Sequence, residues 1–65
     1  MIIEVHRGKD TIFINMDNVL YFCNNEKGGT YFAFVDDDTL SVNDDVSYVL
    51  GCLAWHPTAQ EKLKN

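Results

Sequence analysis

The side chains of this 65-residue chain best suited to metal binding or nucleophilic catalysis are two histidines and two cysteines. His6 and His56 stand far apart, and neither is followed by a second His or Cys at the spacing of a helical zinc site. Cys23 and Cys52 lie inside apolar segments, and no Ser or Cys occupies a recognisable nucleophile turn. We therefore expect no metal site, no cofactor and no covalent catalytic centre.

Two further motifs could in principle bind ions or phosphates. Calcium loops alternate their acidic ligands around a central glycine, whereas Asp36, Asp37 and Asp38 are consecutive. The pair Gly28-Gly29 follows an apolar run but opens no helix, so it does not predict a phosphate-binding loop. A chain this short also has difficulty enclosing a pocket of ordinary ligand volume. The sequence predicts that the protein is not an enzyme.

Acidic residues outnumber basic ones by ten to five, which gives a formal net charge of -5. Such a balance disfavours binding to nucleic acid or to an anionic membrane, because both carry negative charge. Aromatic side chains on a sheet can stack on single-stranded nucleic acid, but that mode requires a cationic groove beside them. We expect a protein partner, with nucleic acid and membrane as poor candidates.

Five aspartates fall within ten residues that contain no Lys or Arg: Asp36, Asp37, Asp38, Asp44 and Asp45. One interpretation is a solvated turn followed by the start of a helix. The other is an acidic edge that steers the protein to a basic surface of a partner.

The elements that must position these residues are five short apolar runs rich in β-branched and aromatic residues, the types that suit a pleated sheet. The runs are residues 2–6, 11–14, 19–23, 30–35 and 39–42. The polar segments between them leave no room for crossover helices, so the strands should be antiparallel. The predicted fold is α+β, an antiparallel meander of four to five strands with one C-terminal helix packed on one face.

The predicted helix covers residues 43–55, where the apolar period changes from two to 3.6. Asn43 is the expected N-cap, with Asp44 and Asp45 in the first turn. Its apolar stripe comprises Val46, Val49, Leu50, Leu53 and Ala54. We assign residues 1–56 to one domain and residues 57–65 to a short tail, because Pro57 disfavours continuation of the helix.

Alternation along the strands predicts more apolar surface than one helix can cover. With one face of the sheet packed on the helix, an aromatic-rich set remains on the other face: Ile2, Phe13, Tyr21, Tyr31 and Val35, together with Val19 and Ala33. Exposed patches of this kind mark protein interfaces. The alternatives are self-association as a dimer or higher oligomer, a different protein partner, or a sheet that curls enough to bury part of the set.

The chain has no apolar run near the roughly 20 residues that span a bilayer, and its first residues do not form a signal peptide. Its two cysteines are not spaced as a disulfide framework, which predicts buried free thiols in a reducing compartment. We therefore expect a cytoplasmic protein.

Residues 12–22, with a strand, an Asp-containing turn and the strand Val19-Leu20-Tyr21-Phe22, resemble the LytTR type of DNA-binding domain. That resemblance implies nucleic-acid binding, although the basic loops of the family are missing. The same segment, with Met1-Ile2, Gly8 and Asn15, is similar to the small FlbD-like proteins of flagellar operons. That resemblance covers about the first 54 residues and implies a structural accessory role. The Asp run replaces the glycine of the later FlbD-like hairpin, and neither resemblance transfers a site.

The sequence thus favours a non-catalytic acidic protein-binding module that acts as a regulator, adaptor or inhibitor of a partner with a basic surface. Small acidic inhibitors of nucleic-acid-binding enzymes, including phage-encoded ones, meet this description. A homo-oligomeric FlbD-like accessory protein and a LytTR-like nucleic-acid-binding module are the alternatives.

Overall fold

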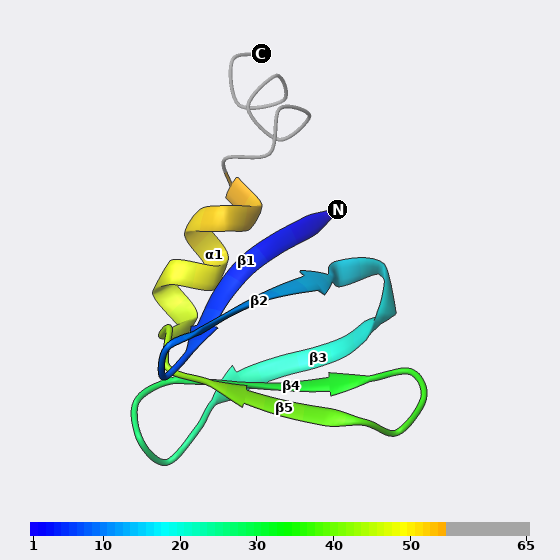
Figure 1. Ribbon diagram of the computed structural model, residues 1–65. Coiled ribbons are helices and arrows are strands. Elements are labelled where there is room, and N and C mark those ends of the chain that lie inside the picture. The colour runs from blue at the N-terminus through cyan, green and yellow to red at the C-terminus, as the bar shows by residue number, and fades with distance from the viewer. Residues whose placement is uncertain (55–65) are drawn as a thin grey trace.

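The computed structural model describes residues 1–54, which form five strands, one short 3-10 helix and one α-helix (Figure 1). The elements are β1 (Ile2–Arg7), β2 (Asp10–Asn15), η1 (Met16–Asn18), β3 (Val19–Asn24), β4 (Thr30–Phe34), β5 (Thr39–Val42) and α1 (Val46–Ala54). All strand pairs are antiparallel, which confirms the predicted α+β class. The predicted helix end at Trp55 and the tail of residues 57–65 lie outside the described residues.

The five strands divide into two sheets, not into the single meander that the short connections predict. β1 pairs with β2, and β3, β4 and β5 form the second sheet. The break falls at η1, where the side chain of Asn15 accepts a hydrogen bond from the backbone N–H of Asp17 at 3.1 Å. The backbone N–H of Met16 then donates to the carbonyl oxygen of Met1 at 2.8 Å. This tight turn redirects the chain, so that β3 begins a new sheet.

The inner faces of both sheets share one core with the helix. The buried apolar side chains are Ile3, Val5 and Ile14 from the first sheet, Phe32 and Val42 from the second, and Val49 from α1. Figure 1 shows the first sheet and α1 on one side of the second sheet. Because strand side chains alternate, the outer faces of the two sheets point away from this common core.

A β-bulge in β3 reverses two side chains relative to strict alternation. The register of β3 against β4 shifts between Val19 and Tyr21. Val19 therefore pairs with Phe34 and packs against the core, while Leu20 is 63% exposed. Strict alternation along residues 19–23 predicts Val19 on the same outer face as Tyr21 and Leu20 on the inner face. The extra residue of the bulge explains both corrections.

Helix α1 begins later than predicted. The carboxylate of Asp45 accepts a hydrogen bond from the backbone N–H of Tyr48 at 2.8 Å, so Asp45 rather than Asn43 is the N-cap. Val49 is buried in the core and Leu53 packs against it, whereas Leu50 remains 53% exposed. The apolar stripe is thus narrower than the sequence pattern indicated.

The free edge of β1 is closed by the segment that follows β5. The carbonyl oxygen of His6 accepts from the backbone N–H of Asn43 at 2.8 Å, and the backbone N–H of His6 donates to the carboxylate of Asp44. The side chain of Asn43 accepts from the N–H of Gly8, and the hydroxyl of Tyr48 donates to the carbonyl oxygen of Glu4 at 2.8 Å. These bonds join the first sheet to the start of the helix.

Two glycines provide a matched test of this packing. A Cβ added at Gly29 would overlap the backbone carbonyl of Val42, whereas one added at Gly51 in α1 would meet no neighbouring atom. We expect Gly29→Ala to lower the free energy of unfolding by about 2 kcal/mol or more, because the overlapped atoms are backbone. Gly51→Ala should raise it by about 0.5–1 kcal/mol through helix propensity. Urea unfolding of both variants measures the two changes, and a destabilised Gly51→Ala would contradict the prediction.

Candidate functional site

The three consecutive aspartates form the tip of the hairpin between β4 and β5, and all three are exposed. The backbone N–H of Asp37 donates to the carbonyl oxygen of Phe34 at 3.1 Å, and that of Phe34 donates to the carbonyl oxygen of Asp38 at 2.9 Å. The carboxylate of Asp36 accepts from the N–H of Asp38 at 3.2 Å. Asp37 has a φ of 69°, in the left-handed region that Asp tolerates better than most residues. The carboxylates are therefore carried on a well-bonded turn.

A fourth aspartate and two apolar side chains lie next to this tip. The backbone N–H of Val35 donates to the carbonyl oxygen of Asn18 at 2.9 Å, which brings η1 and its exposed Asp17 beside the hairpin. Val35 is 58% exposed, and Leu20 is exposed nearby on β3. We call the group of Asp17, Asp36, Asp37 and Asp38 the acidic end. Figure 1 shows both turns at the same end of the molecule.

The basic side chains of residues 1–54 lie at the opposite end. Arg7 ends β1, Lys9 lies in the turn between β1 and β2, and Lys27 lies in the loop between β3 and β4. Antiparallel strands place alternate connections at opposite ends of a sheet, so these turns are separated from the acidic end by the length of the strands. The cation recorded near an acidic-end carboxylate is the N-terminal amine of Met1, 3.6 Å from Asp17.

The structure does not bring all five predicted acidic residues together. Asp44 and Asp45 follow β5 at the basic end, one strand length away from the hairpin tip. Asp44 is partly buried and binds His6, and Asp45 caps α1. The predicted acidic edge is therefore corrected to the hairpin tip with Asp17. Asp44 and Asp45 act within the fold, because Asp44 accepts the outward backbone N–H of His6 and Asp45 accepts the backbone N–H of Tyr48 in the first turn of α1.

His6 lies between two carboxylates. Its Nδ1 is 3.1 Å from an oxygen of Asp44, and its Nε2 is 3.1 Å from an oxygen of Glu4. The hydrogen bond with Asp44 is the main cause that raises the pKa of His6 above 6.5, with a further contribution from Glu4. Only the protonated ring can donate to both carboxylates, since neutral imidazole carries a single N–H. The two carboxylates bind opposite nitrogens, so they do not converge on a common metal position.

The hydroxyl of Tyr48 completes this cluster. The neighbouring Cys52 is the main cause that raises the pKa of Tyr48, followed by desolvation of the ring. The hydroxyl is protonated at neutral pH and donates to the backbone carbonyl oxygen of Glu4. The cluster contains no hydrogen-bonded nucleophile and base of the kind used in acyl transfer, and its bonds hold β1 against α1.

The predicted aromatic face is divided between two sides of the molecule. Ile2 and Phe13 are 66% and 67% exposed on the outer face of the first sheet. Tyr21 and Tyr31 lie on the outer face of the second sheet, with ring centroids 6.5 Å apart. Val35 follows β4 and lies next to the acidic end. Because the sheets enclose a common core, no single surface contains all five residues, which corrects the expectation of one continuous face.

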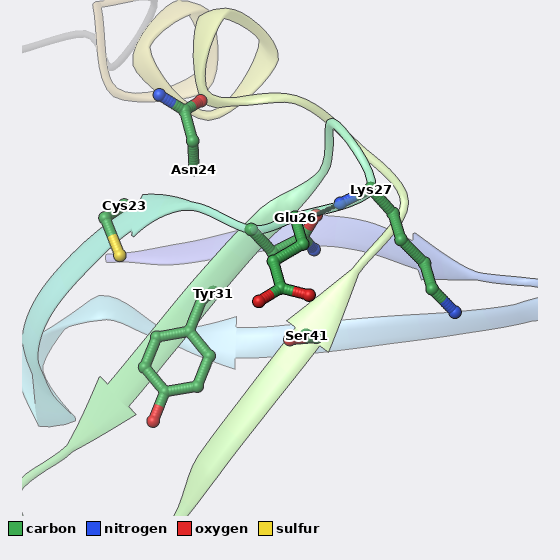
Figure 2. Close-up of a pocket in the computed structure, with 7 residues that line it drawn as sticks. Cys23, Asn24, Glu26, Lys27, Tyr31 and Ser41 are labelled. Carbon is green, nitrogen blue, oxygen red and sulfur yellow. Dashed lines mark hydrogen bonds between the residues drawn. The ribbon is translucent and has the colours of Figure 1, made fainter.

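A shallow hollow of about 490 Å³ lies on the outer face of the second sheet (Figure 2). Cys23, Tyr31 and Ser41 are cross-strand neighbours on its floor, and Glu26 and Lys27 of the adjoining loop line its side. Cys23 is exposed, so the prediction of a buried thiol is wrong for this residue; Cys52 is partly buried, and both thiols are free. Among the described residues, the side-chain hydrogen bonds beside the hollow are those of Asn25 with the backbone of Lys27, Gly29 and Val42.

Comparison of the chain with protein family models, curated proteins and solved structures gives no significant match. No helix in the part of the chain that the structure describes has the length and apolar character required to cross a lipid bilayer. The function must therefore be inferred from the surfaces themselves.

The His6 pairing predicts a pH-dependent stability. A pKa raised in the folded state means that the stabilisation from protonated His6 is fully present below pH 6.5 and is lost as the pH rises through the raised pKa. His6→Gln should remove this component, so the difference in unfolding free energy between the two proteins should shrink above neutrality. Urea unfolding between about pH 5.5 and 8.5 measures the difference, in which the titration of groups common to both proteins cancels. A difference that grows with pH would contradict the assignment.

Proposed function

We propose that the protein is a non-catalytic binding module whose acidic end docks on a basic surface of a protein partner. In this role it acts as a regulator, adaptor or inhibitor of that partner. The observation that carries the proposal is the position of three exposed carboxylates on a well-bonded hairpin tip, at an end where the described chain has no Lys or Arg side chain.

Three physical features support docking at this end. Carboxylates that form no ion pair with Lys or Arg within residues 1–54 remain available to an external cation. Leu20 and Val35 add exposed apolar area next to the charges, and an interface needs such area because surface ion pairs alone contribute little affinity. The turn is held by its own hydrogen bonds, so little conformational entropy is lost when it binds.

The distribution of charge also supports an oriented encounter. Within residues 1–54 the carboxylates of the acidic end have no Lys or Arg side chain beside them, whereas at the opposite end the three basic side chains lie among the carboxylates of Asp10, Glu26, Asp44 and Asp45 and offset most of their charge. A positively charged partner is therefore attracted more strongly to the acidic end. Steering of this kind acts mainly on the association rate and weakens as salt is added.

The test uses two variants that remove the same number of charges. Asp37→Asn with Asp38→Asn neutralises the tip, and Asn tolerates the positive φ at position 37. Asp10→Asn with Glu26→Gln is the control at the opposite end. The partner is first captured from nuclease-treated lysate of the source cell or its host, then purified and measured against each variant. We expect the tip variant to raise Kd by about tenfold or more at low salt, mostly through the association rate, and the control by less than about twofold.

Equal losses for the two variants would show that only net charge matters and would contradict docking through the acidic end. An unchanged Kd for the tip variant would do the same. Circular dichroism of each variant verifies that the fold is retained. We expect it to be retained, because neither pair contacts the core.

A further inference from the structure

β2 is the one long strand in residues 1–54 whose outer edge is neither covered nor interrupted. The edge of β1 is closed by Asn43, Asp44 and Tyr48. β3 contains the bulge after Val19, and β5 has only four residues. Bulges, short strands and covering segments are the usual means by which proteins prevent edge-to-edge pairing. β2 has six residues and none of these features.

The backbone groups of β2 are set for pairing on the outer side. β1 and β2 are joined by the two-residue turn Gly8-Lys9, so Arg7 and Asp10 form the hydrogen-bonded closing pair. Hydrogen-bonded pairs alternate along an antiparallel ladder, which directs the N–H and C=O groups of Thr11, Phe13 and Asn15 away from β1.

The hydrogen bonds of β1 independently indicate the same alternation of inward and outward backbone groups. His6 and Glu4 stand opposite Thr11 and Phe13, and their backbone groups bond outward to Asn43, Asp44 and Tyr48. No described backbone group bonds to the outer side of Thr11 or Phe13.

The side chains of this edge also favour pairing. From Thr11 to Asn15 the strand carries no charge, and Phe13 is 67% exposed on its outer face. A charged residue in the middle of an edge strand disfavours pairing with another strand, and β2 has no charged residue there.

We propose that β2 pairs with β2 of a second copy of this chain as antiparallel strands about a two-fold axis at Phe13. In this register Phe13 faces its own symmetry mate, Thr11 faces Asn15 of the second copy, and Ile12 faces Ile14. All outward backbone groups of Thr11, Phe13 and Asn15 then acquire partners, and the two first sheets become one four-stranded sheet. The outer face of that sheet joins Ile2 and Phe13 of both copies into one apolar stripe.

Charge complementarity favours the second copy over an unrelated strand. Continuing the same register beyond the ends of the strand brings Lys9 of the turn next to η1 of the second copy, which carries Asp17. The symmetry forms this contact twice. Asp10 approaches Met16, so no like charges face each other along the paired strands.

This dimer goes beyond the proposed docking function and does not depend on it. The hairpin tip lies on the second sheet, away from β2, so Asp36, Asp37 and Asp38 remain available in the dimer. Loss of the dimer would therefore leave binding through the tip measurable, and the two ideas can fail separately.

The first experiment uses the unaltered chain. Sedimentation equilibrium from about 10 μM to 1 mM at low salt should show the mass rising from 7.4 kDa toward twice that value. In a mixture of isotope-labelled and unlabelled protein, intermolecular NOEs should connect the α-protons of Ile12 and Ile14, which form the close non-hydrogen-bonded pair. A monomer at 1 mM, or intermolecular NOEs from Tyr21 and Tyr31 instead, would overturn the proposal.

Variants then test the register. Phe13→Lys should lower the association constant by about tenfold or more, because two lysines would face each other at the axis. Tyr21→Lys, at an exposed aromatic of the other outer face, is the control and should retain the dimer. Lys9→Asp should weaken association by about fivefold at low salt, and adding Asp17→Lys should restore it. Failure of the exchanged pair to restore a folded dimer would exclude this register.

Discussion

The polar closure of the free edge of β1 determines the rest of this structure. Asn43, Asp44 and Tyr48 satisfy both outward backbone groups of His6 and the outward carbonyl oxygen of Glu4, which would otherwise face the start of the helix unpaired. The hydroxyl of Thr30, a fully buried polar residue, donates to the carbonyl oxygen of Asp44 at 2.8 Å and extends the connection to the second sheet. Two sheets and one short helix, each too small to be stable alone, thereby enclose one core.

This closure also divides the acidic residues by role. Asp44 and Asp45 lie where the fold needs acceptors, one for the backbone and ring of His6 and one for the first turn of α1. The aspartates of the hairpin tip satisfy only their own turn and remain open to solvent. An acidic run that looks uniform in the sequence thus contains structural carboxylates at one end and available ones at the other.

A core shared by two facing sheets leaves each outer face on its own side of the molecule. The exposed aromatic residues consequently form separate small patches. The first sheet differs from the second in having a long strand, β2, whose outer edge is neither covered nor interrupted. The hairpin tip of Asp36, Asp37 and Asp38 and the edge of β2 are independent surfaces, because they belong to different sheets, and Asp17 is the acidic-end residue that the proposed dimer would also use. A small domain can in this way present one surface to a partner and another to its own copy.

The sequence by itself determined the local elements: all five strands, the helix, the antiparallel pairing and the positions of the turns. Alternating β-branched and aromatic residues, short polar connections and the change of period near residue 43 act locally, so they can be read without the fold. The association of Asp17 with the hairpin tip was missed, although alternate turns of antiparallel strands share an end and could have indicated it. Only the tertiary structure decided the split at η1, the bulge that exchanges Val19 and Leu20, and the assignment of Asp44 to His6. These three features depend on contacts between backbone groups of residues that are distant in the sequence. No local sequence pattern specifies such contacts.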